Sequence, residues 1–311
     1  MVESGLLESA AGHATSVAKA VDYLLRGHPV SSRKKLASLR RWLGWQVGSR
    51  LVPGPVVAPF VGGARLLVRP GMTGATGNIY SGLAEFEDMA FLLHLLSEGD
   101  LFVDIGANIG SYTVLASGVR RARAVAFEPS PLAFQALLDN VNLNRIGPRV
   151  EARNQALGAH SGSVRFTTGL DTVNHVATEQ DTGIETMEVE LTTLDAVVGG
   201  RAPLLIKIDV EGFEHEVIAG ASKTLRNPGV LAVIMETNGS GLHYGVPGDQ
   251  IHSGMTDHGF EACTYAPFER RLVPLGAKQA TTGNTVYIRN VSEVRKRLEA
   301  APKFEVLGLA I

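Results

Sequence analysis

The chain has 311 residues, of which 45% are apolar and 19% are charged, and its formal net charge is −2. This composition is typical of a folded globular protein and excludes a disordered or collagen-like chain, and the length allows one large domain with an extension. A nearly neutral chain gives no electrostatic reason to expect nucleic acid as a partner, because phosphate binding requires a basic face.

Cys263 is the single cysteine, so an internal disulfide and a cysteine metal cluster are both excluded. The first residues lack a basic stretch followed by an apolar core, and no apolar run approaches about 18 residues. We therefore expect neither a secretory signal nor a membrane-spanning helix, and a cytoplasmic protein.

Residues 1–59 are predicted to form an N-terminal helical extension to a main domain over 60–311. Helices are expected over 14–25 and 31–47, with Ser31 or Ser32 as the N-cap of the second. The second helix mixes basic residues with leucine and tryptophan, which permits contact with a membrane surface. A helix packed on the main domain with a solvated basic face is the favoured alternative. Prolines between residues 53 and 59 mark the boundary.

The next hundred residues lead into a pattern of alternating strands and helices. A strand or hairpin is expected over 60–70, a glycine-rich loop over 72–81 and a helix over 85–97, where apolar residues recur at helical spacing. Seven strands then follow, at 101–105, 124–127, 150–156, 204–208, 230–235, 261–265 and 285–289. The helices between and after them are expected at 111–118, 131–144, 214–226, 248–258 and 291–298.

This alternation predicts an α/β fold of the Rossmann-like type, in which helices cover both faces of a mostly parallel seven-stranded sheet. Residues 160–195 interrupt it with two strand-like runs, 163–168 and 186–191, around a polar loop. A loop of this length inside a compact domain is usually functional or disordered.

A glycine turn follows the first strand of the alternating region. Asp104 ends that strand, and Gly106 and Gly110 bracket Asn108 before a helix begins. Bare backbone at such a turn lets a nucleotide-like ligand approach a helix N-terminus. A dinucleotide site would carry three glycines and no preceding carboxylate, since an anion repels a diphosphate. Asp104 instead suits a cationic ligand, which favours S-adenosylmethionine over NAD.

Two further segments extend this predicted cofactor site. Glu128 ends the second strand, where a carboxylate in a nucleotide-binding α/β fold accepts the ribose hydroxyls, and NAD enzymes share this feature. The third strand ends near Gln155 and Ala156, where backbone groups would reach an adenine.

Charged residues mark the ends of the fourth and fifth strands. Lys207, Asp209 and Glu211 are spaced by two, so on a strand they would share one face. A lysine between carboxylates can adjust their pKa values and position a reacting group. Glu236 and Asn238 follow the fifth strand and could join Asp209 as oxygen ligands for magnesium, a secondary alternative.

Histidines at 175, 215 and 243 are candidate general bases, and His243 is the most interesting because it follows the fifth strand.

Taken in order, these motifs resemble those of the FkbM family of S-adenosylmethionine-dependent methyltransferases. The resemblance rests on residues 102–110, 127–129, 156–158, 193–195, 206–212 and 236. It implies a class I methyltransferase fold and O-methylation of a hydroxyl on a sugar or natural product. With the adjoining residues, the expected cofactor site comprises Asp104, Gly106, Ala107, Asn108, Gly110, Glu128, Pro129, Ser130, Gln155, Ala156 and Asp209.

The working hypothesis is methyl transfer to a hydroxyl of a small-molecule acceptor, without a metal. Asp209 would position or deprotonate this hydroxyl, and Lys207 and Glu211 would organise Asp209. The loop 169–185 and the N-terminal helices are expected to cover the acceptor. The alternatives are a non-catalytic S-adenosylmethionine-binding partner subunit and an NAD-dependent oxidoreductase.

Overall fold

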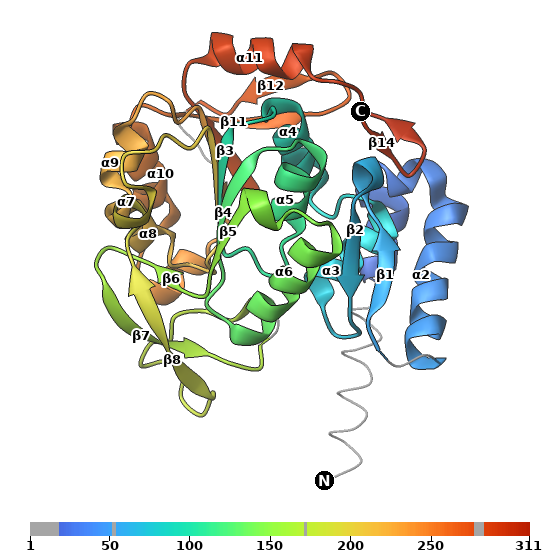
Figure 1. Cartoon of the computed structure of the whole chain (residues 1–311), viewed down its shortest axis with the longest axis horizontal. Helices are drawn as coiled ribbons and strands as arrows, with labels where there is room; N and C mark the ends of the chain where they lie inside the picture. Colours follow the sequence, from blue (N-terminus) through green and yellow to red (C-terminus); the bar gives the residue numbers. More distant parts are fainter. Residues whose placement is uncertain (1–18, 52–53, 171–172, 277–282) are drawn as a thin grey trace.

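A computed structural model describes residues 19–51, 54–170, 173–276 and 283–311, and its centre is an eight-stranded sheet (Figure 1). The strand order is β12-β11-β13-β10-β9-β3-β4-β5. The strands span β3 (Leu101–Ile105), β4 (Arg123–Phe127), β5 (Val150–Arg153), β9 (Leu205–Ile208), β10 (Ala232–Glu236), β11 (Glu261–Ala266), β12 (Arg271–Pro274) and β13 (Asn284–Ile288).

Neighbouring strands from β10 to β5 are parallel, whereas β13 runs antiparallel between β10 and β11. The mostly parallel sheet is therefore confirmed, and each of the seven predicted strands is present. The strand expected over 150–156 ends at Arg153, however, and residues 156–157 form a strand of a second sheet. The eighth strand, β12, was not predicted, and it pairs antiparallel with β11 at the edge of the sheet.

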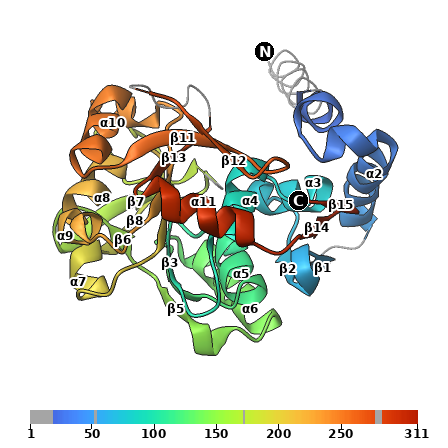
Figure 2. The ribbon, with the colours of Figure 1, turned by 90° about the horizontal axis from the view of Figure 1, so that it is seen from above.

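Helices cover both faces of the main sheet because its strands are apolar on both sides. Phe102 and Leu205 pack into one core with α4 (Phe86–Leu95) and α11 (Val291–Ala300). Their neighbours Val103 and Ile206 face the opposite core. That second core is covered by α7 (Leu194–Val198), α8 (Glu214–Gly220), α9 (Ser222–Arg226) and α10 (Gly248–Asp257). Figure 2 shows α11 crossing the molecule beside α4.

The helix expected over 214–226 is divided into α8 and α9. The carboxylate of Asp195 accepts hydrogen bonds from the backbone N–H groups of Lys223 and Thr224, at 2.9 and 2.7 Å. A carboxylate in this position satisfies free N–H groups at the start of α9, so a new helix begins there.

Residues 73–81 form the helix α3 (Thr73–Ser81), so the prediction of a glycine-rich loop was wrong. A Cβ atom at Gly77 would lie 3.0 Å from Cβ of Ala84, which shows that this glycine permits close packing. The side chain of Asn78 accepts a hydrogen bond from the backbone N–H of Ala84 at 2.9 Å. Packing against the following segment thus compensates for the low helix propensity of glycine.

A smaller three-stranded sheet lies beside the main one and comprises β6 (Ala156–Leu157), β7 (Gly162–Thr167) and β8 (Thr186–Thr192). The two strand-like runs predicted around the polar loop correspond to β7 and β8, which pair antiparallel. The remaining helices of the central region are α5 (Ser111–Val114) and α6 (Pro131–Leu143), and α6 begins at the N-cap Ser130.

The N-terminal part lies at one side of the main sheet (Figure 1). It contains α2 (Lys35–Leu51), preceded by a 3-10 turn over Ser31–Lys34, and the strands β1 (Val56–Pro59) and β2 (Arg65–Val68). Two short C-terminal strands, β14 (Glu305–Val306) and β15 (Leu309–Ala310), lie near α2, and Lys34 donates to the carbonyl of Leu307 at 2.9 Å.

The expectations for this region have mixed outcomes. The helix over 31–47 is confirmed, but Ser31 does not cap it, because its hydroxyl donates to the carbonyl of Leu24 at 2.6 Å. Residues 14–18 of the first expected helix lie outside the described residues. The domain boundary at residue 59 stays a prediction, and β1 pairs with β2 across it. None of the described helices is long and apolar enough to cross a membrane.

Candidate active site

A cavity of about 340 Å³ opens at the carboxyl ends of β3, β4, β9 and β10, where ligands bind in open α/β sheets. Most of the predicted site residues line it, namely Gly106, Ala107, Asn108, Glu128, Pro129, Ser130, Gln155, Ala156, Lys207, Asp209, Glu211 and Glu236. Asp104, Gly110 and Asn238 were predicted too but do not line the cavity.

The glycine turn is held against two neighbouring strands. The backbone N–H groups of Gly106 and Ala107 donate to the carbonyl of Phe127 at 3.0 and 2.9 Å. Gly106 has φ +76°, and a Cβ atom there would lie 1.8 Å from the carbonyl oxygen of Asp209. Only glycine fits such a position, so the turn stays within reach of the segment that follows β9.

Gly110 does not line the cavity, and its predicted contact with the cofactor stays a prediction. A Cβ atom at this residue would lie 2.4 Å from Cδ1 of Leu137, and its φ is +85°. Gly110 therefore permits α6 to pack against the turn, and it contributes to the cavity only indirectly.

Glu128 forms the floor of the same end of the cavity and is 6% exposed. Its two carboxylate oxygens accept hydrogen bonds from the backbone N–H groups of Asn108 and Ser130, both at 2.8 Å. Burial raises the pKa of Glu128 to about 7, although these two hydrogen bonds oppose the shift. A carboxylate can accept about four hydrogen bonds, so two positions remain for the hydroxyls of a ribose.

Asp104 lies below the cavity rather than at its wall, and it is 1% exposed. It accepts a hydrogen bond from the hydroxyl of Thr113 at 2.6 Å, and its Oδ1 atom has no hydrogen-bond partner among the described residues. Burial raises the pKa of this carboxyl, and the ammonium of Lys207, which is its partner in the strand register, opposes the shift. The direct contact with an ammonium ligand expected of Asp104 stays a prediction.

Lys207 is 3% exposed, lines the cavity and forms an ion pair with Asp209. Its Nζ atom lies 2.5 Å from Oδ2 of Asp209 and 4.8 Å from the ring centroid of Tyr112. Burial alone would lower the pKa of this ammonium, but the nearby carboxylates, first among them Asp209, raise it instead. Lys207 is therefore a fixed positive charge that orients Asp209.

Three carboxyl groups converge beside this ion pair, since oxygen atoms of Asp209, Glu211 and Glu236 lie within 4.8 Å of one another. Burial and the neighbouring Asp209 raise the pKa of Glu211 to about 7 and that of Glu236 to about 9. These pKa values favour a protonated Glu236 at neutral pH, whereas Glu211 lies close to the midpoint of its titration.

Backbone conformation places Glu211 in this cluster. Strand β9 ends at Ile208, so the expected run of three charges on one strand face was wrong beyond that residue. Glu211 has φ +53°, a left-handed conformation that is strained for a residue other than glycine. Such strain persists where the surrounding structure enforces it, and it is concentrated at functional sites.

Among the lining residues that were not predicted as site residues, Glu85 and Tyr112 are polar and lie beside Lys207. The hydroxyl of Tyr112 donates to the carboxylate of Glu85, and both side chains border the cavity next to Lys207. The only signal in the sequence was the acidic start of the helix after residue 85. Asn238 does not point to Asp209, because its amide donates to Oε1 of Glu236 at 2.8 Å.

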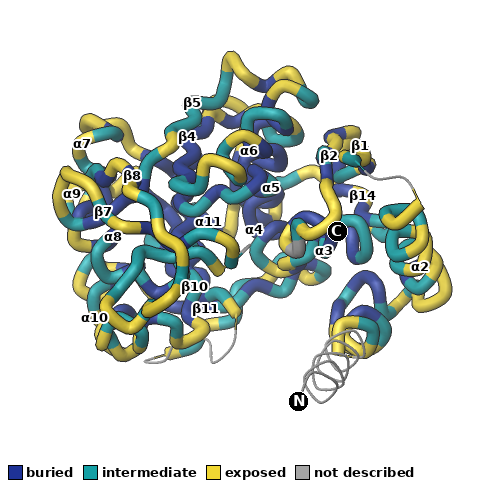
Figure 3. The backbone as a smooth tube through the Cα atoms, turned by 90° about the horizontal axis from the view of Figure 1, so that it is seen from below, coloured by how far each residue is buried: buried dark blue, intermediate teal, exposed yellow. Residues whose placement is uncertain are grey.

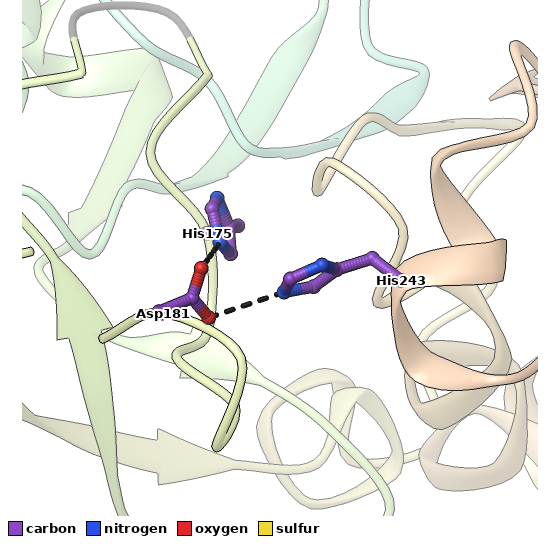
Figure 4. Close-up of side chains that lie close together, drawn as sticks. All are labelled: His175, Asp181 and His243. Carbon is purple, nitrogen blue, oxygen red and sulfur yellow. Dashed lines mark hydrogen bonds and ion pairs between the residues drawn. The ribbon is translucent and has the colours of Figure 1, made fainter.

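Two of the candidate histidines contact the same carboxylate and do not line the cavity. His175 and His243 both contact Asp181, as Figure 4 shows, and neither lines the cavity. His215 lies in α8 and does not line it either.

The sheet order, the glycine turn and the ribose-type carboxylate together define a Rossmann-like class I methyltransferase fold. Residues 104–262 match the model of the methyltransferase FkbM domain. The chain is 30% identical over 219 residues to the hexuronic acid methyltransferase AglP of Haloferax volcanii. The aligned region covers 68% of this chain and 84% of that protein. The chain belongs to the FkbM methyltransferase family.

Two further relatives agree with this assignment. The 31-O-demethyl-FK506 methyltransferase FkbM of Streptomyces tacrolimicus is 32% identical over 171 residues, which is 43% of this chain and 65% of that protein. The methyltransferase sdnD of Sordaria araneosa is 27% identical over 215 residues, or 57% of this chain and 79% of that protein. The chain is thus an S-adenosylmethionine-dependent methyltransferase, as its motifs predicted, and not an oxidoreductase.

Proposed function

We propose that this enzyme methylates a hydroxyl group on a sugar or on a sugar-like part of a natural product. Two relatives support this acceptor class by name, one acting on a hexuronic acid and one on an O-demethylated natural product. The proposal rests mainly on the ion pair at the cavity wall between the buried Lys207 and the partly exposed Asp209, whose Nζ and Oδ2 atoms lie 2.5 Å apart. It presents a fixed carboxylate to which a hydroxyl can donate.

The cofactor occupies the end of the cavity formed by the glycine turn. Glu128 accepts the ribose hydroxyls, the backbone beside Gly106 and Asn108 borders the ligand, and Gln155 and Ala156 border the adenine. When bound, S-adenosylmethionine supplies an activated methyl group on its sulfonium. Asp104 acts from below the cavity by its negative charge, because its carboxylate is buried beside Lys207 in the strand register.

The acceptor occupies the end with the carboxyl cluster. Asp209 accepts the hydrogen bond of the reacting hydroxyl and thereby fixes its orientation, and Lys207 holds Asp209 in place. As the methyl group bonds to the hydroxyl oxygen, the proton passes along this hydrogen bond to Asp209 and from there to Glu211, whose carboxylate oxygen lies within 4.8 Å of that of Asp209. Glu211 is suited to keep the proton, since a general base is most effective when its pKa lies near the working pH and that of Glu211 is raised to about 7.

This arrangement requires no magnesium ion. Lys207 already supplies the positive charge that faces Asp209, and the amide of Asn238 is engaged with Glu236. We expect equal turnover with and without added magnesium. A strict requirement for it would instead assign Asp209, Glu211 and Glu236 to a metal ion.

The loop between β7 and β8 covers the acceptor. Asn174 and Val176 from this loop line the cavity, and the hydroxyl of Tyr244 donates to the carbonyl of Val176 at 2.7 Å.

The proposal is tested with labelled S-adenosylmethionine and a panel of acceptors: a hexuronide, a neutral glycoside, a simple amine and a phenol. Label on a sugar hydroxyl is expected. Label that appears only on the amine or the phenol would contradict the proposed acceptor class.

A further inference from the structure

His175, Asp181 and His243 form a cluster that the proposed reaction does not use. Nε2 of His175 lies 3.1 Å from Oδ1 of Asp181, and Nε2 of His243 lies 3.1 Å from Oδ2 of the same carboxylate (Figure 4). His175 and Asp181 come from the loop between β7 and β8, whereas His243 comes from the 3-10 turn Ser240–Tyr244 after β10. The three side chains are mostly buried, with exposed fractions of 15%, 6% and 28%.

The hydrogen bonds of His175 require a cation between its ring and Asp181. Nδ1 of His175 lies 2.9 Å from the carbonyl oxygen of Val173, and a carbonyl can only accept, so Nδ1 must carry a proton. In a neutral ring Nε2 then has a free lone pair, which faces a carboxylate oxygen. Two acceptors lie together only when a proton or a metal ion stands between them.

The same hydrogen bond is the support that metal-binding histidines usually have. A backbone carbonyl that accepts from one ring nitrogen fixes the tautomer and leaves the other nitrogen free to bind a metal. The hydroxyl of Thr178 lies 3.0 Å from Nε2 of His243 and also donates to Asp181. The neighbouring polar groups therefore keep the cluster in one arrangement.

We propose that His175, Asp181 and His243 bind a divalent transition-metal ion, with zinc as the preferred ion. Two imidazole nitrogens and one carboxylate oxygen are a known donor set for such ions. Zinc bonds of about 2.0–2.1 Å place tetrahedral ligand atoms about 3.3 Å apart. Each histidine nitrogen lies 3.1 Å from a different oxygen of Asp181, and one ligand atom from each of the three residues lies within 4.8 Å of the others, so the three ligands are already close to this spacing. The fourth position stays open to water or to the hydroxyl of Thr178.

The bound ion would hold the loop that covers the acceptor. It joins that loop to residues 240–244 through His175 and His243. Each histidine directly precedes one partner of an existing hydrogen bond, the one that the hydroxyl of Tyr244 donates to the carbonyl of Val176. The proposal does not depend on the nature of the acceptor, since it concerns the chain's own loops.

The test is calorimetric titration of zinc into the full chain after removal of metals. We expect one equivalent to bind, and His175→Ala and His243→Ala each to weaken binding at least tenfold. His160→Ala, at an exposed histidine, is the matched control and should bind zinc as the unchanged chain does. Cobalt should give the visible spectrum of a tetrahedral site with nitrogen ligands, and magnesium should not compete.

Binding of S-adenosylhomocysteine, measured on each variant, shows that the variant is folded. Absence of zinc binding by the folded wild-type chain would overturn the proposal and leave a proton between His175 and Asp181. Zinc binding that survives both histidine changes would overturn it too. So would zinc binding that is lost in Glu211→Gln, because the ion would then occupy the carboxyl cluster.

A second inference rests on the charge and exposure of the N-terminal region, defined here as residues 19–59. This region contains eight lysines and arginines and one aspartate, a net charge of +7, whereas the rest of the chain has −9. Of the ten large apolar side chains that are exposed among the described residues, seven lie within it: Tyr23, Leu36, Leu43, Val47, Leu51, Val56 and Val57.

Four of these side chains form one face of α2. Leu36, Leu43, Val47 and Leu51 are separated by seven, four and four residues, which places them on a single side of a helix. Their exposed fractions range from 47% to 75%, and the exposed Arg40 and Arg50 belong to the same side. A helix that faces only water would carry polar residues there. Figure 3 shows the exposed side of α2 at the edge of the molecule.

We infer that this face of α2 binds the surface of an anionic lipid bilayer. Apolar side chains enter the boundary between headgroups and acyl chains, and the surrounding cations are attracted by anionic headgroups. The charge of the region fits this partner better than a second copy of the chain, since two +7 regions would repel each other.

The test is co-sedimentation of the full chain with vesicles of phosphatidylcholine, with and without phosphatidylglycerol. Binding is expected only to the anionic vesicles and should weaken as salt is added. The double variant Leu43→Gln, Val47→Gln should bind at least tenfold more weakly. Leu132→Gln, at a side chain 85% exposed on α6, is the control and should bind normally.

Lack of binding to anionic vesicles would overturn this inference. Light scattering on the same proteins tests whether a second copy of the chain covers this face instead. A dimer that forms with the unchanged chain but not with the double variant would assign the face to a second copy, and would also overturn the lipid-binding inference.

Discussion

The two ends of the cavity are built in different ways. The end near the glycine turn depends on backbone: N–H groups of Asn108 and Ser130 hold Glu128, and Gly106 lies against the backbone of Asp209. The end with the carboxyl cluster depends on charged side chains, with Lys207 and three carboxyl groups close together. Backbone contacts fix a shape, whereas converging charges fix protonation states, and the enzyme uses the first to hold a ligand and the second to react.

This difference predicts that changes at the two ends will have separate effects. Changes near Glu128 should alter ligand affinity, and changes in the carboxyl cluster should alter turnover and its pH dependence.

Asp209→Asn should have the largest effect, a loss of turnover of about 10³-fold. The amide oxygen can still accept from Lys207, so the buried ammonium keeps a partner, but the amide cannot bind the acceptor hydroxyl as a charged group. Turnover with labelled S-adenosylmethionine measures this loss. Asp257→Asn, at an exposed carboxylate, is the control, and an Asp209 variant that retains control-level turnover would refute its role.

Glu211→Gln should reduce turnover about 10²-fold at pH 8 and change the pH profile. Because the pKa of Glu211 is raised to about 7, the base is active only when deprotonated, so turnover of the unchanged enzyme should rise up to about pH 7 and then level off. The variant should lack this rise. Glu261→Gln, at an exposed glutamate, should keep it, and a rise that persists in Glu211→Gln would assign the proton to another group.

Glu128→Gln should weaken binding of S-adenosylhomocysteine about 10–100-fold, while turnover at saturating cofactor stays within about fivefold. Both carboxylate oxygens accept backbone N–H groups, so the amide would present its own N–H₂ to one of these donors. Calorimetry measures the affinity. Unchanged affinity would remove Glu128 from the cofactor site.

Glu236→Gln should have the smallest effect, an increase in Tm of roughly 2–4 °C at pH 9 and little change at pH 5. The native carboxyl has its pKa raised from 4.5 to about 9, so it keeps a proton that the unfolded chain releases. Its stabilisation is present below about pH 4.5 and is lost as the pH rises through about 9. Thermal melts at both pH values measure this, and an equal shift at the two would contradict it.

Sequence could predict the backbone-built end more completely than the charged end. Strands β3, β4 and β10 contain continuous apolar runs, and the glycine turn and Glu128 directly follow the first two of them. The edge strand β12 was missed because its four residues are partly exposed and have no apolar pattern. Helix α3 was missed because the packing of Gly77 against Ala84 is visible only in three dimensions.

The charged end joins segments that are far apart in the chain. Glu85 precedes α4, Tyr112 lies in α5, and both reach Lys207 through packing that no local pattern encodes. Glu211 lies in the cluster because of its left-handed backbone and not because of strand alternation. The residue types were therefore predictable, but their arrangement and protonation states were not.

Calorimetric titration of Asp209→Asn with S-adenosylhomocysteine tests most directly the separation of the two ends. The account predicts a Kd within about tenfold of that of the unchanged enzyme, alongside the loss of turnover. A loss of affinity as large as that of Glu128→Gln would show that Asp209 belongs to the cofactor end, and would contradict the division of the cavity.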